Sequence, residues 1–582
     1  MWRAAALAIG PALVLAGCGA PGPEGEVLRV AVASEAGDGS PLAAHMADDM
    51  TRPRLIERDS AGQLVGGLAS SWRFLDDGSA LILRLRPVKW SDDRPLVALD
   101  VVNGFRAAAR LPAAAPAFRM ARIMGAEDVA RDVRRASLGV GAPTTRVVEL
   151  KLLAPSPLLL EWLAEPEMAV MGSGRTPQTL ALYAREDISD KTNDRTASET
   201  SPVAGLMSVA RLQRRAQAPS PEAMPAEVQI FATAAVDKAV AAFRRGKLDV
   251  VIGEGLAGLG EARVGGRRDA LQLDALAGVY GWQVNALKGP LADAGLRRAL
   301  ADVIDRAAMT SRFGITALQP EAGLLPPSLR PLPMPETLSP VPQDAAAATT
   351  PGVAAGLRRA ADAVGGAVGT VVGGMVGGAA NVLTGGSRME EEQLAARQSE
   401  ARALLLAARM AAAGRMADAG GESLAARAGD DLPPLQLSLL VPPGREHRTI
   451  AERVAADWRP LGVELQLKVA DRETRAKLIK AGDFDLAVDE TSTRVRDAAA
   501  LLERFRCGAG PHCNAAADAL LDAARLAPPA QRARLLASAE LAMLSGPPMI
   551  GLFTQVRWAL VSPQVKGWVP NAAGHPLGRL SR

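Results

Sequence analysis

The chain has 582 residues, of which 48% are hydrophobic and 22% are charged, a balance typical of a soluble globular protein with two or three domains. Its 67 basic and 63 acidic side chains leave a net charge of only +4. The basic residues are scattered among acids, so the composition gives no reason to expect nucleic acid as a partner.

The N-terminus has the pattern of a secretory signal. Arg3 precedes an apolar run, residues 4–16, that is too short to span a bilayer as a stable helix. The run ends in Leu15-Ala16-Gly17-Cys18, which resembles the lipobox of bacterial lipoproteins, where the signal is cut before a cysteine that becomes lipid-modified. A plain signal peptide with an incidental cysteine is the alternative. We predict a signal peptide at 1–17, lipidation of Cys18 and a Gly/Pro-rich tether at 18–26.

The folded body begins with a predicted strand, "VLRVAV", at Val27–Val32. Asp76-Asp77-Gly78 is a turn signal, and the alternating "ALILRLR" that follows predicts a half-buried strand. The segment "PLVALDVVNGFRAA" then predicts a helix with Asp100 near its first turn.

This block resembles the signature of the bacterial extracellular solute-binding proteins of family 5, the dipeptide, oligopeptide and nickel-type receptors of ABC importers. The matching segments are Leu68-Ala69, Ser71-Trp72, Asp76-Asp77-Gly78, Leu85-Arg86, Val88-Lys89-Trp90, Pro95-Leu96, Ala98 and Asp100-Val101-Val102. One residue is missing before Val88, and Asp93 replaces the usual glycine. Later segments resemble the family in the same order, including residues 155–171, 239–253 and 284–309, and the C-terminal helices with their returning strand.

The resemblance implies an α/β fold of the periplasmic binding protein type, with two lobes, a hinge and an extra subdomain in the N-terminal lobe. We expect lobe I at 27–55, 165–275 and 530–582, the extra subdomain at 56–164, and lobe II at 276–529. Independently of the family, helix–glycine–strand units recur in "RRGKLDVVI", "KAGDFDLAV" and "AERVAADWRPLGVELQLKVAD". Ligands of such folds bind at the carboxyl ends of strands or between lobes.

Residues 340–390 look like an insertion into lobe II. The segment "AVGGAVGTVVGGMVGGAANVLTGGS" contains no charge, and glycines recur every fourth position from Gly365 to Gly377. Small residues at this spacing can line a helix face that packs in a membrane. A flexible surface loop is the interpretation that we favour, because each glycine costs a helix in water about 1 kcal/mol relative to alanine. Contact with a membrane or with another copy of the chain is the alternative.

The stretch "GDFDLAVDETSTRVRD", from Gly482 to Asp497, changes from apolar to polar at its middle. The counterpart in peptide receptors of the family reads roughly "GDYDLALSGWGADYPDP", and its Trp and Asp hold the ligand's amino terminus. Aligned without gaps, those two positions are Thr491 and Arg494. The candidate ligand-binding residues are therefore Asp489, Glu490, Thr491 and Arg494.

Three alternatives remain open for this stretch. Arg494 suits a bidentate grip on a carboxylate or phosphate. Asp489 and Glu490 could instead bind an ammonium group if the local alignment slips. In the third alternative the loop contacts no ligand, or Arg494 only pairs with Asp497.

The remaining chemistry favours binding over catalysis. Cys507 and Cys513, in "CGAGPHC", predict a disulfide, because an exported protein meets an oxidising compartment. A metal site with His512 is the less favoured alternative, since no further ligands lie nearby. The four histidines have no ligand spacing, and no hydrolase or metalloprotease motif is present. We expect no enzyme activity, no cofactor and no metal.

The sequence thus predicts a lipid-anchored substrate-binding protein of an ABC importer, on the periplasmic face of the cell envelope. Its expected partners are a peptide or other small polar ligand, the permease with its ATPase, and the membrane through the lipid anchor. The alternative is a sensory or assembly lipoprotein on the same fold, with a degenerate cleft and no role in transport.

Overall fold

The computed structural model describes residues 27–35, 39–75, 77–133, 136–172, 180–186, 203, 206–215, 224–265, 270–313, 315, 318–330, 399, 401–406, 434–570 and 577–581. The predicted signal peptide, the tether with Cys18 and the insertion at 340–390 lie outside these residues and stay predictions.

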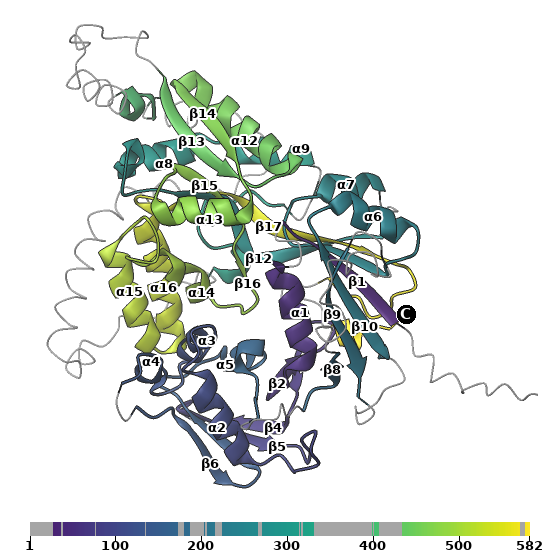
Figure 1. Cartoon of the computed structure of the whole chain (residues 1–582). Helices are drawn as coiled ribbons and strands as arrows, with labels where there is room; N and C mark the ends of the chain where they lie inside the picture. The colour runs from purple at the N-terminus through teal and green to yellow at the C-terminus, as the bar shows by residue number, and fades with distance from the viewer. Residues whose placement is uncertain are drawn as a thin grey trace, which may run out of the picture.

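One large mixed sheet of eleven strands runs through the molecule (Figure 1). Its order is β14-β13-β15-β12-β17-β11-β1-β10-β9-β8, with β16 paired to β12. The strands are β1 (Val27–Ala33), β8 (Tyr183–Arg185), β9 (Met207–Arg214), β10 (Glu227–Thr233), β11 (Val250–Gly253), β12 (Leu271–Val284), β13 (Leu435–Val441), β14 (Val463–Val469), β15 (Leu486–Asp489), β16 (Ser492–Thr493) and β17 (Met549–Val561). We call β1 and β8–β11 the lobe I strands, and β13–β16 the lobe II strands.

Strands β12 and β17 are the long antiparallel pair that connects the two sets. At one end Val561 of β17 pairs with Val250 of β11, and at the other β12 pairs with β15. Their mutual register shifts between Ala275 and Val279, and within that interval β12 pairs with the short β16. The mixed α/β architecture expected from the sequence is confirmed, and this ribbon is where the lobes join.

The side chains of β1 point alternately to the two faces of the sheet, and helices cover both faces of the lobe I strands. Leu28, Val30 and Val32 pack in a core with helix α1 (Pro41–Thr51), whereas Ala31 and Ala33 pack with α6 (Val236–Arg244) and α7 (Leu259–Gly265). Successive side chains of a strand point to opposite faces, so one strand serves both cores. This places the ends of parallel β1 and β11 between covering helices.

Elements β2 to η2 have a core of their own (dark blue at the bottom of Figure 1). They are β2 (Ile56–Arg58), β3 (Leu64–Gly66), β4 (Ala69–Phe74), β5 (Ala80–Leu85), α2 (Ala98–Ala108), α3 (Ala115–Met120), α4 (Ala126–Ala130), β6 (Val140–Thr144), β7 (Val147–Lys151), α5 (Leu159–Leu163) and η2 (Pro166–Met168). A four-stranded sheet, β4-β5-β7-β6, carries the helices. We call this unit the small subdomain; the domain boundaries expected from the sequence stay a prediction.

The family signature has a structural role in this unit. The carboxylate of Asp100 accepts hydrogen bonds from the Trp90 indole (3.0 Å), the Val97 backbone (3.1 Å) and Arg94 (3.0 Å). These bonds hold the loop after β5 against the first turn of α2, where a carboxylate also favours the helix dipole. In this chain Asp100 and its neighbours in the motif thus stabilise a folded corner.

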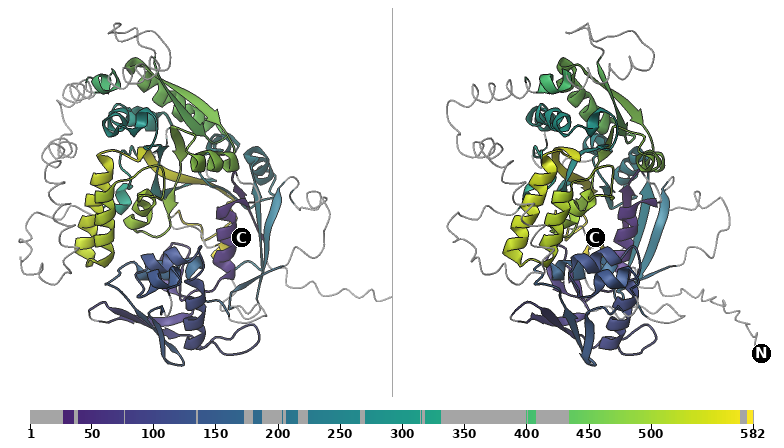
Figure 2. Two further views of the ribbon diagram at one scale, coloured as in Figure 1. Left: turned by 60° about the vertical axis from the view of Figure 1, so that its left-hand side comes forward. Right: turned by 90° about the vertical axis from the view of Figure 1, so that its left-hand side faces the viewer.

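Further helices follow β12 in the chain; most pack on the lobe II strands or on β12 and β17, whereas the last, η11, packs in the lobe I core. They are η4 (Pro290–Ala292), α8 (Ala294–Asp302), α9 (Arg306–Phe313), η5 (Pro327–Leu329), α12 (Arg445–Trp458), η9 (Arg459–Leu461), α13 (Arg472–Ala481), α14 (Ala498–Leu502), η10 (Glu503–Phe505), α15 (Ala515–Leu526), α16 (Pro529–Leu544) and η11 (Leu577–Arg579). Figure 2 shows α15 and α16 side by side above the small subdomain. Arg122 of the small subdomain donates to the carbonyls of Ala524 and Ala527 at the end of α15.

The predicted helix–glycine–strand units are confirmed as α6–β11, α12–β14 and α13–β15. In each unit a glycine with positive φ ends the helix region: Gly246 (68°), Gly462 (76°) and Gly482 (66°). That conformation suits glycine because it has no Cβ. Asp471 begins α13 by accepting from the Thr474 backbone at 2.8 Å. Among the described residues, no helix has the length and apolarity needed to cross a membrane.

Candidate functional site

Loops that follow the ends of β1, β11 and β15 meet between the two sets of strands. Glu490, directly after β15, accepts a hydrogen bond from the Leu256 backbone, after β11, at 3.1 Å. A Cβ at Gly255 would lie 2.7 Å from Glu490 Oε1, so the glycine leaves room for this carboxylate. Glu35, after β1, pairs with Arg475 of α13 at 2.8 Å. The carboxyl ends of strands from both lobes thus converge here, as binding sites of α/β proteins do.

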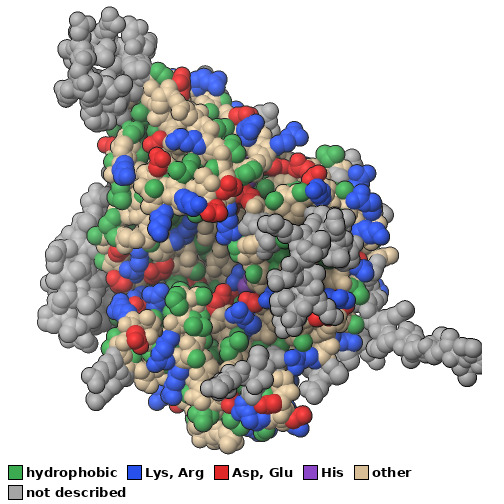
Figure 3. All heavy atoms as spheres, viewed as in Figure 1, with side chains coloured by type: hydrophobic (Ala, Val, Ile, Leu, Met, Phe, Trp, Pro, Cys, Tyr) green, Lys and Arg blue, Asp and Glu red, His purple; other side chains and the backbone are tan. Residues whose placement is uncertain are grey.

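Figure 3 shows the surface hollowed between the small subdomain and the rest of the molecule, with acidic and basic side chains around the hollow. Glu490 is 23% exposed. Burial is the main reason why its pKa rises to about 7: the Leu256 hydrogen bond and the charge of Arg475 lower the pKa, whereas Asp489 and Glu254 raise it. Burial also raises the pKa of Glu35, against the lowering effect of Arg475. Two carboxyl groups in one site are therefore held less acidic than usual, and each would gain from a cation.

A buried histidine lies behind Glu490. The His447 side chain is fully buried, and its Nδ1 lies 2.9 Å from the Tyr280 hydroxyl. Its Nε2 has no hydrogen-bond partner and lies 3.9 Å from Glu490 Oε2. Burial lowers the pKa of His447 to about 4, so the ring is neutral at pH 7 and does not neutralise Glu490.

Asp489 and Thr491 form a local turn that supports the loop. Asp489 Oδ1 accepts from the Thr491 backbone (2.9 Å) and hydroxyl (2.8 Å), and its other oxygen pairs with Arg504. Asp489 is buried, and these hydrogen bonds and the ion pair occupy both of its carboxylate oxygens. The charge of Asp489 is therefore already balanced by Arg504 and is not free for a ligand.

Arg494 points to the small subdomain. Its Nε donates to Glu165 at 2.9 Å, and Glu167 lies 3.7 Å from Nη2, while the side chain is 34% exposed. Asp497 pairs instead with Arg532 and begins α14 by accepting from the Ala499 backbone. The suggested Arg494–Asp497 pair is therefore wrong, because Asp497 is turned to the C-terminal helices.

The structure brings Asp489, Glu490 and Thr491 together and places Arg494 at a second contact between the lobes. Sequence reasoning missed Glu35, His447 and Arg475 as neighbours of Glu490. Glu35 carried a usable signal, since a polar residue directly after the first predicted strand lies at a carboxyl end. His447 and Arg475 lie inside helices α12 and α13, where nothing in the local sequence distinguishes them from scaffold.

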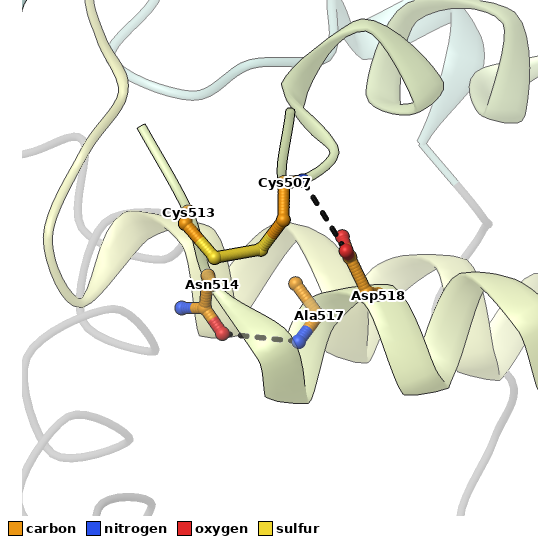
Figure 4. Close-up of a disulfide and its surroundings, with 5 residues drawn as sticks. All are labelled: Cys507, Cys513, Asn514, Ala517 and Asp518. Carbon is orange, nitrogen blue, oxygen red and sulfur yellow. Dashed lines mark hydrogen bonds between the residues drawn. A yellow bond between two sulfur atoms is a disulfide. The ribbon is translucent and has the colours of Figure 1, made fainter. Parts of the chain in front are cut away.

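Cys507 and Cys513 form a disulfide that ties the loop after η10 to the start of α15 (Figure 4). Asn514 follows and begins the helix by accepting from the Ala517 backbone at 3.0 Å. Within the described ranges, no group of three or more His, Cys, Asp or Glu side chains is arranged to hold a metal ion.

A family model described as bacterial extracellular solute-binding proteins, family 5 Middle, matches residues 63–362. A curated protein of Escherichia coli (strain K12), "Probable deoxycholate-binding periplasmic protein YgiS", is 35% identical over 119 residues. That match covers 20% of this chain and 22% of the length of that relative.

Solved structures match over nearly the whole chain. Haemophilus influenzae OppA in complex with RPPGFSPFR has 18% identity and a TM-score of 0.66, covering 96% of this chain and 99% of that one. The Escherichia coli murein tripeptide binding protein MppA also has 18% identity and a TM-score of 0.66, with 96% and 98% covered. At this identity the likeness is one of fold, the two-lobed α/β fold expected from the sequence.

Proposed function

The chain belongs to family 5 of the bacterial extracellular solute-binding proteins, and we propose that it is the substrate-binding subunit of an ABC importer. The family consists of binding proteins and not of enzymes. In this proposal the protein is anchored through Cys18 on the periplasmic side of a membrane. It captures a peptide or other small polar solute between its lobes and delivers it to a permease with an ATPase.

The observation that carries the proposal is the meeting of Glu35 and Glu490 from opposite lobes at the ends of their strands. Only one cation, Arg475, makes an ion pair with either carboxylate among the described residues. Burial disfavours an unbalanced negative charge, so a ligand cation entering here would be stabilised. The supported ligand class is therefore a solute with an ammonium or guanidinium group, such as the amino end of a peptide.

This assignment shifts the amine contact from the Asp position of relatives to Glu490. Arg494 stands at that Asp position, and its charge is balanced by Glu165 and Glu167. The guanidinium of Arg494 offers a ligand cation no acceptor, whereas the carboxylate of Glu490 would attract one. Contact with both lobes would favour the closed form, since a ligand shifts an equilibrium by its differential affinity for the two states.

Identification of the ligand is the first test. Mass spectrometry of the mature protein purified from its native host should reveal a bound cationic solute. With that solute, Glu490→Gln should weaken binding at least about tenfold in calorimetry, because it removes the charge but keeps an acceptor for Leu256. Glu473→Gln, on exposed α13, is the matched control and should bind like the wild type. Equal affinity of the two variants would remove Glu490 from the site.

Ligand binding should also depend on pH. A cation binds the ionised carboxylate, so binding near pH 7 drives a proton off Glu490, whose pKa is about 7. The dissociation constant should therefore rise as the pH falls below 7, by up to about tenfold per unit. In Glu490→Gln this slope should disappear between pH 5 and 7; a slope that persists there would assign the proton to another group.

A sensory or assembly role that does not involve transport is the second candidate function, and one observation favours it. The position at which relatives hold a ligand is taken by Arg494 in ion pairs with Glu165 and Glu167. A protein of this kind would carry no co-purifying solute, and no compound of a peptide and amine library would shift its melting temperature. Either a bound solute or such a shift would decide for transport.

A further inference from the structure

A pocket of about 170 Å³ lies beside the disulfide, between η4–α8 and the ends of α15 and α16. Its lining includes Leu287, Arg297, Phe505, His512 and Met543. None of the residues of the proposed interlobe site lines it. The disulfide loop of Figure 4 forms one wall through Cys513.

His512 is a buried polar group without a partner in this wall. His512 is 5% exposed, and neither nitrogen of its ring makes a hydrogen bond of normal geometry. The Arg504 carbonyl is near enough to influence its protonation. A Cβ at Gly510 would lie 2.6 Å from its Cε1, so the glycine makes room for the ring. Buried polar groups are rarely left without partners, which points to a missing one.

Arg297 supplies a buried positive charge to the same pocket. Its guanidinium donates to four backbone carbonyls, those of Leu291, Ala292, Gly546 and Pro547, at 2.8–3.1 Å. Within the described part of the chain it makes no ion pair with a carboxylate. Arginine has five N–H donors, so one is left over after these four bonds. The carbonyls fix the guanidinium in place but do not neutralise its charge, and Asp293, whose charge acts on Arg297, is not in ion-pair contact with it.

The electrostatics of the pocket favour an anion. Burial chiefly lowers the pKa of His512, and the charges of Arg504 and then Arg297 lower it further. The Arg504 backbone carbonyl and, more weakly, Asp518 act in the opposite direction but contribute less than burial, and the Arg504 side chain is itself paired with Asp489. His512 is therefore neutral at pH 7 and offers one N–H donor. The rest of the lining includes the apolar side chains of Leu287, Phe505 and Met543, and the amide of Asn514, which is already bonded to the Ala542 carbonyl and the Ala517 backbone.

We propose that this pocket binds a small monocarboxylate with a short apolar body, its carboxylate toward Arg297 and His512. A cavity of about 150 Å³ accommodates benzene, so the volume suits a compact acid of that size. The carboxylate would supply the charge that Arg297 lacks and an acceptor for the His512 N–H. The site is separate from the interlobe cleft, so this inference does not rest on the proposed transport function.

The test uses propanoate as the probe and the mature chain labelled with ¹³C at histidine Cε1. The chain has four histidines, and a His512→Gln variant identifies the signal of His512. At constant ionic strength, propanoate should shift that signal saturably and raise the pKa of His512, because a nearby anion favours imidazolium. Propanamide, which is similar in shape but neutral, should not. Absence of a saturable shift, or an equal shift with propanamide or at His447, would overturn the proposal.

Variants at the rim of the pocket complete the test without disturbing its core. Leu287 is 63% exposed, so a polar side chain there should not impair folding. Leu287→Asp should weaken propanoate binding at least about tenfold by charge repulsion. Leu287→Asn, of nearly the same shape, should bind within about threefold of the wild type. Equal binding by the Asp variant and the wild type would contradict the assignment.

Discussion

At the scale of single residues, Glu490 should cost the ligand-free protein stability. Its pKa is raised to about 7 by burial, so the folded state holds a proton that the unfolded state releases above its ordinary pKa of 4.5. The free energy of unfolding therefore falls as the pH rises from 4.5 to 7. Glu490→Gln should remove this penalty and stabilise the protein by about 1–3 kcal/mol at pH 8, but little at pH 5.

Urea unfolding of the wild type and Glu490→Gln at both pH values measures this effect. A stabilisation of equal size at pH 5 and pH 8 would show that the charge of Glu490 is not its source. The same variant should bind the ligand less tightly. A gain in stability together with a loss of affinity is typical of a residue that is retained for function at a cost in stability.

At the scale of elements, Asp100 illustrates a charge that stabilises the fold. Burial raises its pKa, but bonds from Val97, Arg94 and Trp90 lower it more, and the net pKa lies below the ordinary value. Its stabilisation is present above the unfolded pKa and is lost as the pH falls through the folded pKa. Asp100→Asn should destabilise the protein by about 1–2 kcal/mol at pH 7, and the difference should shrink near pH 3.

The matched control is Asp93→Asn in the same loop, whose side chain is 79% exposed. Asparagine tolerates the positive φ of 63° at that position. Its unfolding midpoint should stay close to that of the wild type. If both variants lost the same stability, the loss would come from removing a negative charge in the loop and not from the bonds of Asp100.

The contrast between these elements shows what sequence could and could not predict. Local sequence signals predict strand β5, helix α2 and the helix–glycine–strand units. These signals are the alternation of apolar and polar residues, a turn followed by an acidic residue in the first helical turn, and a glycine after the helix. The partners of the candidate site residues are not local. Leu256 is 234 positions from Glu490, and Glu165 is 329 positions from Arg494. No periodicity encodes such distances, so the sequence predicted where the loop lies but not what balances its charges.

At the scale of the whole molecule, ion pairs connect the two lobes. Arg475 of lobe II pairs with Glu35 of lobe I, and Arg494 of lobe II pairs with Glu165 of the small subdomain. Both arginines thus contribute contacts between the lobes, while β12 and β17 form the ribbon that joins them. Partly buried pairs of this kind contribute more than exposed ones, because solvent screens them less.

Arg475→Met should therefore shift the ligand-free protein toward an open form. The variant keeps the apolar stem but leaves Glu35 without its cation, so the buried carboxylate gains from solvation when the lobes separate. Small-angle scattering should show a larger radius of gyration than in the wild type. Lys477→Met is the matched control, because it removes the same charge from the same helix at a site that is 73% exposed. The control should scatter like the wild type; equal expansion of both variants would trace the opening to net charge and not to the Glu35–Arg475 contact.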